Sequence, residues 1–304
     1  MAEKQSLDRL LTEQRNAASE DIDAKSTLEI IEIINQQDRN VAEAVAQAIP
    51  AIAEAVDVIT ERLGKGGRLI YIGAGTSGRL GVLDAAECGP TFSVAAELVQ
   101  GVIAGGEAAL ARATEAGEDD PEAGAAELRQ RGLSESDVVV GIAASGRTPY
   151  VLGAMAEARR MAAATIGISC TPDSELSRAV EIPITVLTGP EVIAGSTRMK
   201  AGTATKLVLN MLSTAAMIRL GHVYGNLMVN VQPTNHKLME RARRIVSHAS
   251  GLGVEEAGRV LEEAGSVRTA IVMALARCSR EEAESRLKAA KGKVREALES
   301  ARNG

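Results

Sequence analysis

Five short runs of consecutive apolar residues constrain the fold of this chain more than any other feature. They cover residues 68–73, 98–104, 137–143, 165–170 and 182–187. The runs do not alternate between apolar and polar residues, which indicates strands covered on both faces, as in a parallel sheet flanked by helices. The segments between them have the length and composition of helices. The sequence therefore predicts an α/β fold with a doubly wound, five-stranded parallel sheet.

Helical patterns occupy the chain before and after these runs. Apolar residues recur near a period of 3.6 in the first sixty residues, and Ser26 and Glu29 have the spacing of a capping box. A long helix is expected at 196–220. Shorter helices are expected at 237–248, 254–264, 267–278 and 280–300. We therefore expect an N-terminal helical segment (1–58), a sheet domain (59–222) and a small C-terminal helical bundle (237–304).

Composition and charge argue against several classes of function. The 304 residues carry a net charge of −6 and are only 1% aromatic. The charges are dispersed, without a basic tract that could follow a phosphate backbone, and aromatic platforms for bases are scarce, so we expect no nucleic-acid partner. No apolar run reaches the roughly 20 residues of a membrane span. We therefore expect no membrane partner.

The cysteines and the first residues indicate a reducing compartment. Cys88, Cys170 and Cys278 are odd in number and lie far apart without C-x-x-C spacing. This is typical of reduced thiols rather than of disulfides or a zinc site. The histidines form no ligand pattern, so we expect no metal. Residues 1–15 mix charges of both signs and contain no apolar segment like that of a signal peptide, so we expect a cytoplasmic protein.

Two loops of similar composition follow the first and third runs. The first loop (residues 74–79) contains Gly75, Thr76, Ser77, Gly78 and Arg79, and the second loop (144–149) contains Ser145, Gly146, Arg147 and Thr148. Glycine permits positive φ, free N–H groups at a helix start attract anions, and hydroxyls and arginine add donors. Ligands of doubly wound sheets bind beyond the carboxyl ends of the strands. We therefore expect the two loops to bind a phosphate group, with Ser77, Ser145 and Thr148 as its ligands.

Two other interpretations of these loops compete with phosphate binding. Residues 73–78 also match G-x-G-x-x-G, the dinucleotide-binding pattern, which is weak on its own. The second run ends in Gly105-Gly106 rather than in the acidic residue that holds a ribose, and a second Ser-Gly-Arg loop has no role in such a site. Ordinary strand-to-helix turns explain the glycines but not the arginine and hydroxyls of both loops. We expect no cofactor.

The two loops, together with two further segments, resemble the N-acetylmuramic acid 6-phosphate etherases. These segments are Asp84-Ala85-Ala86-Glu87-Cys88 and the highly specific stretch from Gly189 to Thr203, GPEVIAGSTRMKAGT. The likeness runs from Thr12 through Met228 into the helical tail. Where the family pattern has Asp-Ala-Ser-Glu-Cys-Pro-Pro, this chain has Ala86 and Gly89 in place of Ser and Pro, which leaves Glu87 unchanged.

The resemblance implies a fold and a reaction. The fold is a sugar isomerase (SIS) domain with a flavodoxin-like sheet, in a homodimer. The reaction is that of a carbon–oxygen lyase, which cleaves the D-lactyl ether of N-acetylmuramic acid 6-phosphate with water. Its products are N-acetylglucosamine 6-phosphate and D-lactate, in the recycling of cell-wall sugar.

Such a reaction needs a general acid and a general base, because the ether lies β to the masked aldehyde and the proton at C2 must be removed. By resemblance, Glu87 matches the proton donor of the family and Glu118 its second active-site acid. From the residues alone, a solvated acid near a helix end explains Glu87 better than a catalytic role does, although the apolar stretch around it could partly desolvate it, and only the resemblance favours the catalytic role. Spacing does not select Glu118 from its acidic neighbours Glu115, Asp119, Asp120 and Glu122.

Arg198 and Lys200 are cationic where the phosphate or the lactyl carboxylate could lie, and a solvated surface pair explains them equally well.

Two other functions share this fold. A sugar-phosphate sensor such as glucokinase regulatory protein binds without catalysis, but it carries two SIS domains and is about twice as long. An aldose–ketose isomerase also abstracts the proton at C2.

Overall fold

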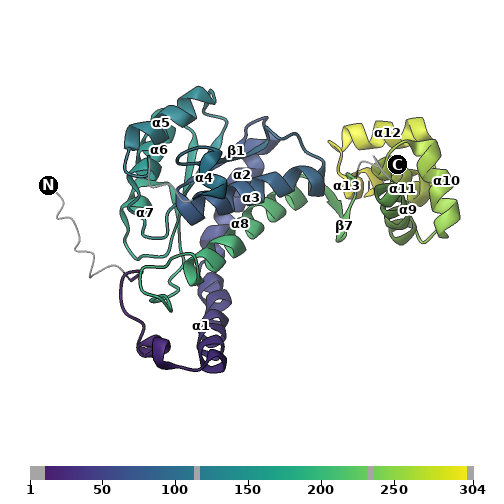
Figure 1. The fold of residues 1–304 in the computed structure, drawn as a ribbon. Helices are drawn as coiled ribbons and strands as arrows, with labels where there is room; N and C mark the ends of the chain where they lie inside the picture. The colour runs from purple at the N-terminus through teal and green to yellow at the C-terminus, as the bar shows by residue number, and fades with distance from the viewer. Residues whose placement is uncertain (1–10, 113–116, 232–235, 300–304) are drawn as a thin grey trace. The chain divides into compact units, whose positions relative to one another are not determined.

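The computed structural model describes residues 11–112, 117–231 and 236–299 of the chain (Figure 1). They form two compact units. Unit 1 contains the described residues of 1–86 and 96–213, and unit 2 contains residues 87–95 and those from 214 onward. The three-part division by chain order stays a prediction.

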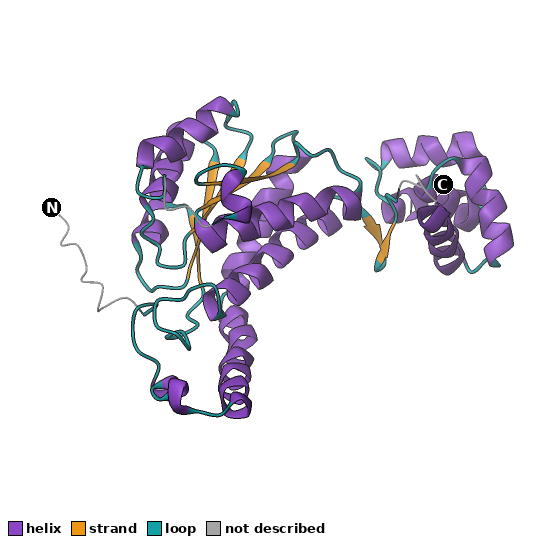
Figure 2. Cartoon of the chain, in the orientation of Figure 1, coloured by secondary structure: helices purple, strands orange, loops and turns teal. Residues whose placement is uncertain are grey.

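Unit 1 is built on a parallel sheet of five strands in the order β2-β1-β3-β4-β5 (Figure 2). The strands are β1 (Leu69–Gly73), β2 (Val99–Ile103), β3 (Val138–Ile142), β4 (Ala164–Ser169) and β5 (Ile182–Thr185). Every residue of the central strands β1, β3 and β4 is buried, whereas the edge strands are partly exposed. The predicted doubly wound sheet is therefore confirmed, strand by strand.

Helices cover both faces of this sheet. They are α3 (Gly75–Phe92), α4 (Ala108–Ala111), α5 (Pro121–Gln130), α6 (Pro149–Arg160) and α7 (Glu175–Ala179). α6 packs against β1, β3 and β4, where Tyr150 and Met155 join Ile70 and Val139 in one core cluster. α3 covers the other face, because Gly81 lies against Tyr71, whose side chain points away from those of its neighbours in β1.

Two helices precede the sheet, after short 3-10 turns η2 (Ala17–Ser19) and η3 (Ile22–Ala24). They are α1 (Thr27–Gln47) and α2 (Ile49–Gly64). The predicted capping box at the start of α1 is confirmed, since the Ser26 N–H donates to the Glu29 carboxylate at 2.8 Å and the Glu29 N–H donates to the Ser26 hydroxyl. α2 packs against β3 and β5. The first half of α1 leaves apolar side chains in solvent: Leu28 is 67% exposed and Ile31 is 58% exposed.

Unit 2 is mainly helical. It contains α9 (His236–Ser250), α10 (Val254–Ala264), α11 (Val267–Ala276), α12 (Arg280–Ala289) and α13 (Val294–Glu299), which share one apolar core. The prediction of a single helix at 280–300 is wrong, because the chain forms two helices there. Lys291 and Gly292 adopt positive φ, and the Gly292 N–H bonds back to the Leu287 carbonyl, which ends α12. None of the described helices is long and apolar enough to cross a membrane.

Candidate active site

The strand order locates the site. From β1 the chain passes through α3 to β2 at one edge, and it then returns to β3 on the other side of β1. The strand order therefore reverses between β1 and β3, which the first and second loops follow, and ligands of doubly wound sheets bind at such a point. Gly73 and Ile142, the last residues of the two strands, lie in register. The structure thus brings both predicted loops to one edge of the sheet.

The first loop depends on close packing of glycines. A Cβ on Gly78 would lie 2.6 Å from the Gly73 carbonyl oxygen and 2.7 Å from the Ile103 side chain, and Gly75 adopts a φ of +52°. The start of α3 can therefore approach the strand ends closely, with Thr76 and Ser77 half-buried in its first turn. In that turn the Gly78 N–H donates to the Ala74 carbonyl at 3.1 Å. The earlier N–H groups of a helix start have no carbonyl partner within the helix and attract anions.

Arg79 has a different position from the one expected. Its guanidinium donates to the carbonyl oxygens of Leu110 (3.2 Å) and Arg112 (3.1 Å). These bonds tie α3 to the segment that contains α4. Arg79 thus stabilises the region around the first loop, and its contact with a substrate stays a prediction.

The second loop presents its hydroxyls beside the start of α6. Gly146 turns the chain with a φ of +66°, and a Cβ there would lie 2.3 Å from that of Ser174. Ser145 and Thr148 are half-buried, and the Thr148 hydroxyl makes no capping bond to α6. Arg147 lies 3.6 Å from the Glu175 carboxylate. Two hydroxyls and one guanidinium therefore lie together after the end of β3, where they line one cavity.

A cavity of about 570 Å³ opens beside the second loop. Its walls come from the second loop and α6 (Ser145, Arg147, Thr148, Pro149, Leu152), the segment before α5 (Glu118, Asp119, Pro121), α7 (Glu175) and the N-terminal segment (Glu13). The Glu118 carbonyl accepts the Tyr150 N–H at 3.1 Å, which fixes Glu118 against the start of α6. The structure thus places one of the two predicted acids beside the predicted phosphate ligands.

The structure also separates Glu118 from two of its acidic neighbours, Asp120 and Glu122, which spacing could not do. Asp120 caps α5 by accepting from the N–H groups of Glu122 and Ala123, and Glu122 pairs with Arg129. Glu118 and Asp119 line the cavity, while Glu115 lies outside the described residues.

Glu87, the other predicted acid, is exposed on the part of α3 that belongs to unit 2. The desolvation expected from its apolar surroundings is therefore wrong for the single chain. The buried acid of this segment is Asp84, one turn earlier, which accepts a hydrogen bond from the Ser213 hydroxyl at 3.2 Å. Burial raises the pKa of Asp84, against the opposing effect of hydrogen bonds from Tyr71 and Ser213 and of the Lys206 charge. No pattern in the sequence marks Asp84 as a group with a shifted pKa.

α8 (Lys200–Arg219) begins next to the first loop, since a Cβ on Gly202 would lie 3.6 Å from the Thr76 methyl group. The buried Glu191 carboxylate caps this helix by accepting from the N–H groups of Lys200 and Ala201, each at 2.9 Å. This cap explains why α8 begins at Lys200 rather than at residue 196.

Lys200 and Arg198 have opposite environments. Lys200 is only 3% exposed, and its ammonium group donates to the Gln37 side chain at 3.0 Å. Burial lowers the pKa of Lys200, while the charges of Glu191 and Asp38 oppose that effect. A solvated surface pair is therefore wrong for Lys200, whereas Arg198 is exposed in the turn before α8.

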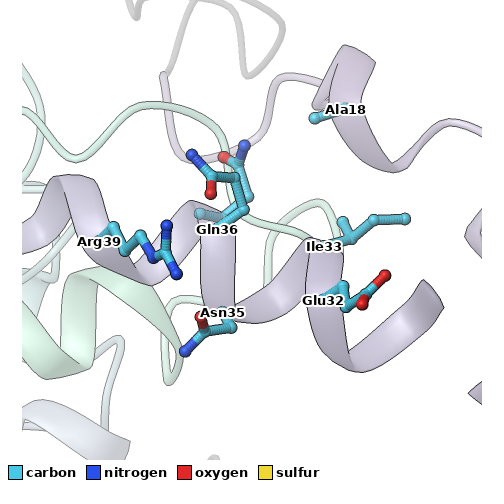
Figure 3. Close-up of a pocket in the computed structure, with 7 residues that line it drawn as sticks. Ala18, Glu32, Ile33, Asn35, Gln36 and Arg39 are labelled. Carbon is cyan, nitrogen blue, oxygen red and sulfur yellow. The ribbon is translucent and has the colours of Figure 1, made fainter. Parts of the chain in front are cut away.

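A second hollow, of about 430 Å³, lies between η2 and α1 (Figure 3). Its lining is mainly amide and charged side chains of α1, among them Glu32, Asn35 and Arg39. It contains none of the residues that the sequence predicts for the active site. Within the ranges that the structure describes, no three His, Cys, Asp or Glu side chains are grouped as a metal ion requires.

The sheet order and the paired loops define a SIS-domain protein, and family models agree. The SIS domain matches residues 123–215, and the N-terminal SIS domain of glucokinase regulatory protein matches residues 51–159. A phosphoheptose isomerase from Francisella tularensis shares the fold with a TM-score of 0.50 and 20% identity, over 64% of this chain and 100% of that chain.

Closer relatives identify the family within this class. The N-acetylmuramic acid 6-phosphate etherase of Aeromonas hydrophila is 55% identical over 94% of this chain and 96% of its own length. That of Symbiobacterium thermophilum is 58% identical over 89% of this chain and 90% of its own length. The chain belongs to the N-acetylmuramic acid 6-phosphate etherases, a family of carbon–oxygen lyases, and the family resemblance found in the sequence is confirmed.

Proposed function

We propose that this chain cleaves the D-lactyl ether of N-acetylmuramic acid 6-phosphate and releases N-acetylglucosamine 6-phosphate and D-lactate. The observation that carries the proposal is that two donor-rich loops follow the adjacent strands β1 and β3 at one edge of the sheet, and that the second loop and Glu118 line one cavity. Relationship to etherases over nearly the whole chain supports the same substrate.

The phosphate group binds to the two loops in this proposal. The N–H groups at the start of α3 and the hydroxyls of Ser77, Ser145 and Thr148 donate to its oxygens. The remaining proposed contacts are Gly75, Thr76, Gly78 and Arg79 of the first loop, and Gly146 and Arg147 of the second. Arg198, which is exposed, is the cation proposed for the phosphate or the lactyl carboxylate. Lys200 holds the start of α8 in place through Gln37 and Glu191.

The reaction is an elimination followed by a hydration. In the ring-opened sugar the C1 carbonyl acidifies the proton at C2, so that a carboxylate can remove it while the C3–O bond breaks. A double bond forms between C2 and C3, and the departing lactate oxygen takes a proton from a general acid. Water then adds its hydroxyl to C3 and a proton returns to C2. We assign the general acid to Glu87, on the family match, and the second acid–base role to Glu118, which borders the cavity.

Lactate release in ¹⁸O-labelled water tests the proposal. The purified chain is incubated with N-acetylmuramic acid 6-phosphate, and both products are analysed by mass spectrometry. The label is expected in the sugar and not in the lactate, because the bond that breaks is C3–O. Label in the lactate would contradict elimination. A ketose phosphate would indicate an isomerase, and an absence of turnover with retained sugar-phosphate binding would indicate a sensor.

We further propose that the chain forms a homodimer through the first half of α1. This half exposes Leu28 and Ile31 beside the hollow at η2, and exposed apolar patches of this kind are typical of interfaces. Light scattering is expected to give twice the 31.7 kDa mass of the chain, and the double variant L28E/I31E is expected to be monomeric. A monomeric wild type would contradict this proposal.

A cytoplasmic location is also proposed. It rests on the three free cysteines, which a reducing compartment maintains. Cell fractionation with the native chain tests it, and recovery in the membrane or external fraction would contradict it.

A further inference from the structure

We propose that Glu13 is a further substrate-binding residue, which accepts hydrogen bonds from neutral groups of the sugar. Glu13 lies in residues 12–19, a segment that we call the strap. This inference rests on the proposed function, because it takes the ligand to be a sugar phosphate. It adds to that function a contact with the sugar part of the substrate, separate from the contacts with the phosphate.

The strap is fastened to the loop that connects β5 to α8. The Gly195 N–H donates to the Thr12 carbonyl at 3.0 Å, the Asn16 side chain donates to the Pro190 carbonyl at 3.0 Å, and the buried Ser19 hydroxyl donates to the Val192 carbonyl at 2.7 Å. Three bonds over eight residues fix the backbone on both sides of Glu13. The strap is therefore held in a defined position on unit 1.

Asn16 connects the strap to the residues that hold α8. Its side-chain amide also donates to the Gln37 oxygen at 2.8 Å, and the same oxygen accepts from the Lys200 ammonium group at 3.0 Å. The strap, α1 and the start of α8 thus share one group of hydrogen bonds. This arrangement keeps the strap at the carboxyl edge of the sheet.

Gly195 makes room for the Glu13 carboxylate. Its φ is +77°, and a Cβ at this position would lie 3.0 Å from the Glu13 Oε2 atom. A side chain at residue 195 would therefore be strained and would also push against Glu13. The carboxylate that passes Gly195 forms part of the wall of the 570 Å³ cavity, which Ser145 and Thr148 also line.

The chemistry of the cavity indicates what Glu13 binds. An ionised carboxylate only accepts hydrogen bonds, so its partner must be a donor. A phosphate on the two loops and the lactyl carboxylate are both anionic and are repelled by Glu13. Arg147, the cation of the cavity wall, already lies beside Glu175. The remaining donors of a sugar phosphate are its hydroxyls and the N–H of its acetamido group, and we assign Glu13 to these.

The test compares inhibition by the sugar phosphate with inhibition by phosphate alone. For the wild type, Glu13→Ala and Glu13→Gln, kcat and KM are measured by lactate release, and inhibition constants are measured for N-acetylglucosamine 6-phosphate and inorganic phosphate. Glu13→Ala is expected to raise KM and the inhibition constant of the sugar phosphate about tenfold, the effect of one lost charge-assisted hydrogen bond. Inhibition by inorganic phosphate is expected to change by less than about twofold, and Glu13→Gln, which keeps an acceptor, to lie between the wild type and Glu13→Ala.

Two further variants serve as controls. Glu20→Ala removes an exposed acid of the same N-terminal region that pairs with Arg15 and does not line the cavity, and it is expected to match the wild type. Gly195→Ala is expected to displace the carboxylate and to raise KM as Glu13→Ala does. Thermal unfolding measured for each variant separates a loss of binding from a loss of folding.

The proposal is overturned if the wild type releases lactate and Glu13→Ala leaves both sugar-phosphate constants unchanged. It is also overturned if Glu13→Ala weakens inhibition by the sugar phosphate and by inorganic phosphate equally, because Glu13 would then affect the binding of phosphate at the two loops. If the wild type releases no lactate, the etherase proposal fails instead. Calorimetric binding of N-acetylglucosamine 6-phosphate to the same variants then still decides the role of Glu13.

Discussion

At the scale of single residues, two acids one turn apart on α3 have opposite environments. Asp84 is buried between β1 and α8, and its pKa is raised by that burial, whereas Glu87 is in solvent. The sequence identified Glu87 through the family resemblance. The burial of Asp84 could not be predicted from the sequence, because the Ser213 hydroxyl that contacts it lies 129 residues away and no local pattern indicates that contact.

Replacing Glu87 by Gln tests the assignment of the general acid. The substitution keeps the size of the side chain and removes the transferable proton. Turnover is expected to fall by about 10²-fold or more, the usual contribution of a general acid, with the inhibition constant of N-acetylglucosamine 6-phosphate nearly unchanged. Lactate release and product inhibition measure the two effects. Undiminished turnover would remove Glu87 from the reaction.

Replacing Asp84 by Asn tests the buried carboxyl group. Because the pKa of Asp84 is raised in the folded chain, the folded state holds this proton more tightly than the unfolded state does. Stability from this group is therefore present at acidic pH and is lost as the pH rises from the unfolded pKa through the folded one. The free energy of unfolding of Asp84→Asn minus that of the wild type is therefore expected to be larger at pH 7 than at pH 4. Urea unfolding measures the difference, and a difference that does not depend on pH would contradict the account.

At the scale of elements, the sequence predicted those that carry a continuous signal. All five strands of the parallel sheet were found because their residues are mainly apolar, and α1 because its capping box is local. The short hairpin of β6 (Val223–Tyr224) and β7 (Leu227–Met228) was missed, because two residues per strand form no pattern. The break before α13 was missed because it depends on the backbone conformation of Lys291 as well as Gly292.

The starts of β1 and β3 are joined by an ion pair that can be tested. Asp137 accepts from the Arg68 guanidinium at 2.7 and 3.1 Å, from the Arg68 N–H at 2.8 Å and from the Ser134 N–H at 2.9 Å. Burial alone would raise the pKa of Asp137, but these hydrogen bonds outweigh it and lower the pKa. Asp137→Asn is expected to cost about 2 kcal/mol of unfolding free energy at pH 7.

The pH dependence of that loss has a defined sign. Because the pKa of Asp137 is lower in the folded chain, the carboxylate stabilises the fold at any pH above its pKa in the unfolded chain, near 3.9. This stabilisation disappears as the pH falls through its pKa in the folded chain. The difference between wild type and Asp137→Asn is therefore expected to shrink between pH 7 and pH 3 in urea unfolding. An equal difference at both pH values would show that the charge of Asp137 does not matter.

At the scale of the whole molecule, the position of the candidate site in the fold could be predicted in part from the sequence. The two loops were predictable because the carboxyl ends of parallel strands share one edge of a sheet. The strap, its Glu13 and the Glu191 cap were not, because their contacts join distant segments without a repeating pattern. What the sequence lacked was therefore the geometry that brings Glu13 and Glu118 to the second loop in one cavity.

The central claim is that the first and second loops together hold the phosphate of the sugar. A crystal structure of the chain with N-acetylglucosamine 6-phosphate measures this directly. Phosphate oxygens are expected within hydrogen-bond distance of the hydroxyls of Ser77, Ser145 and Thr148, with the sugar extending into the cavity that Glu118 lines. A phosphate bound away from both loops would contradict it.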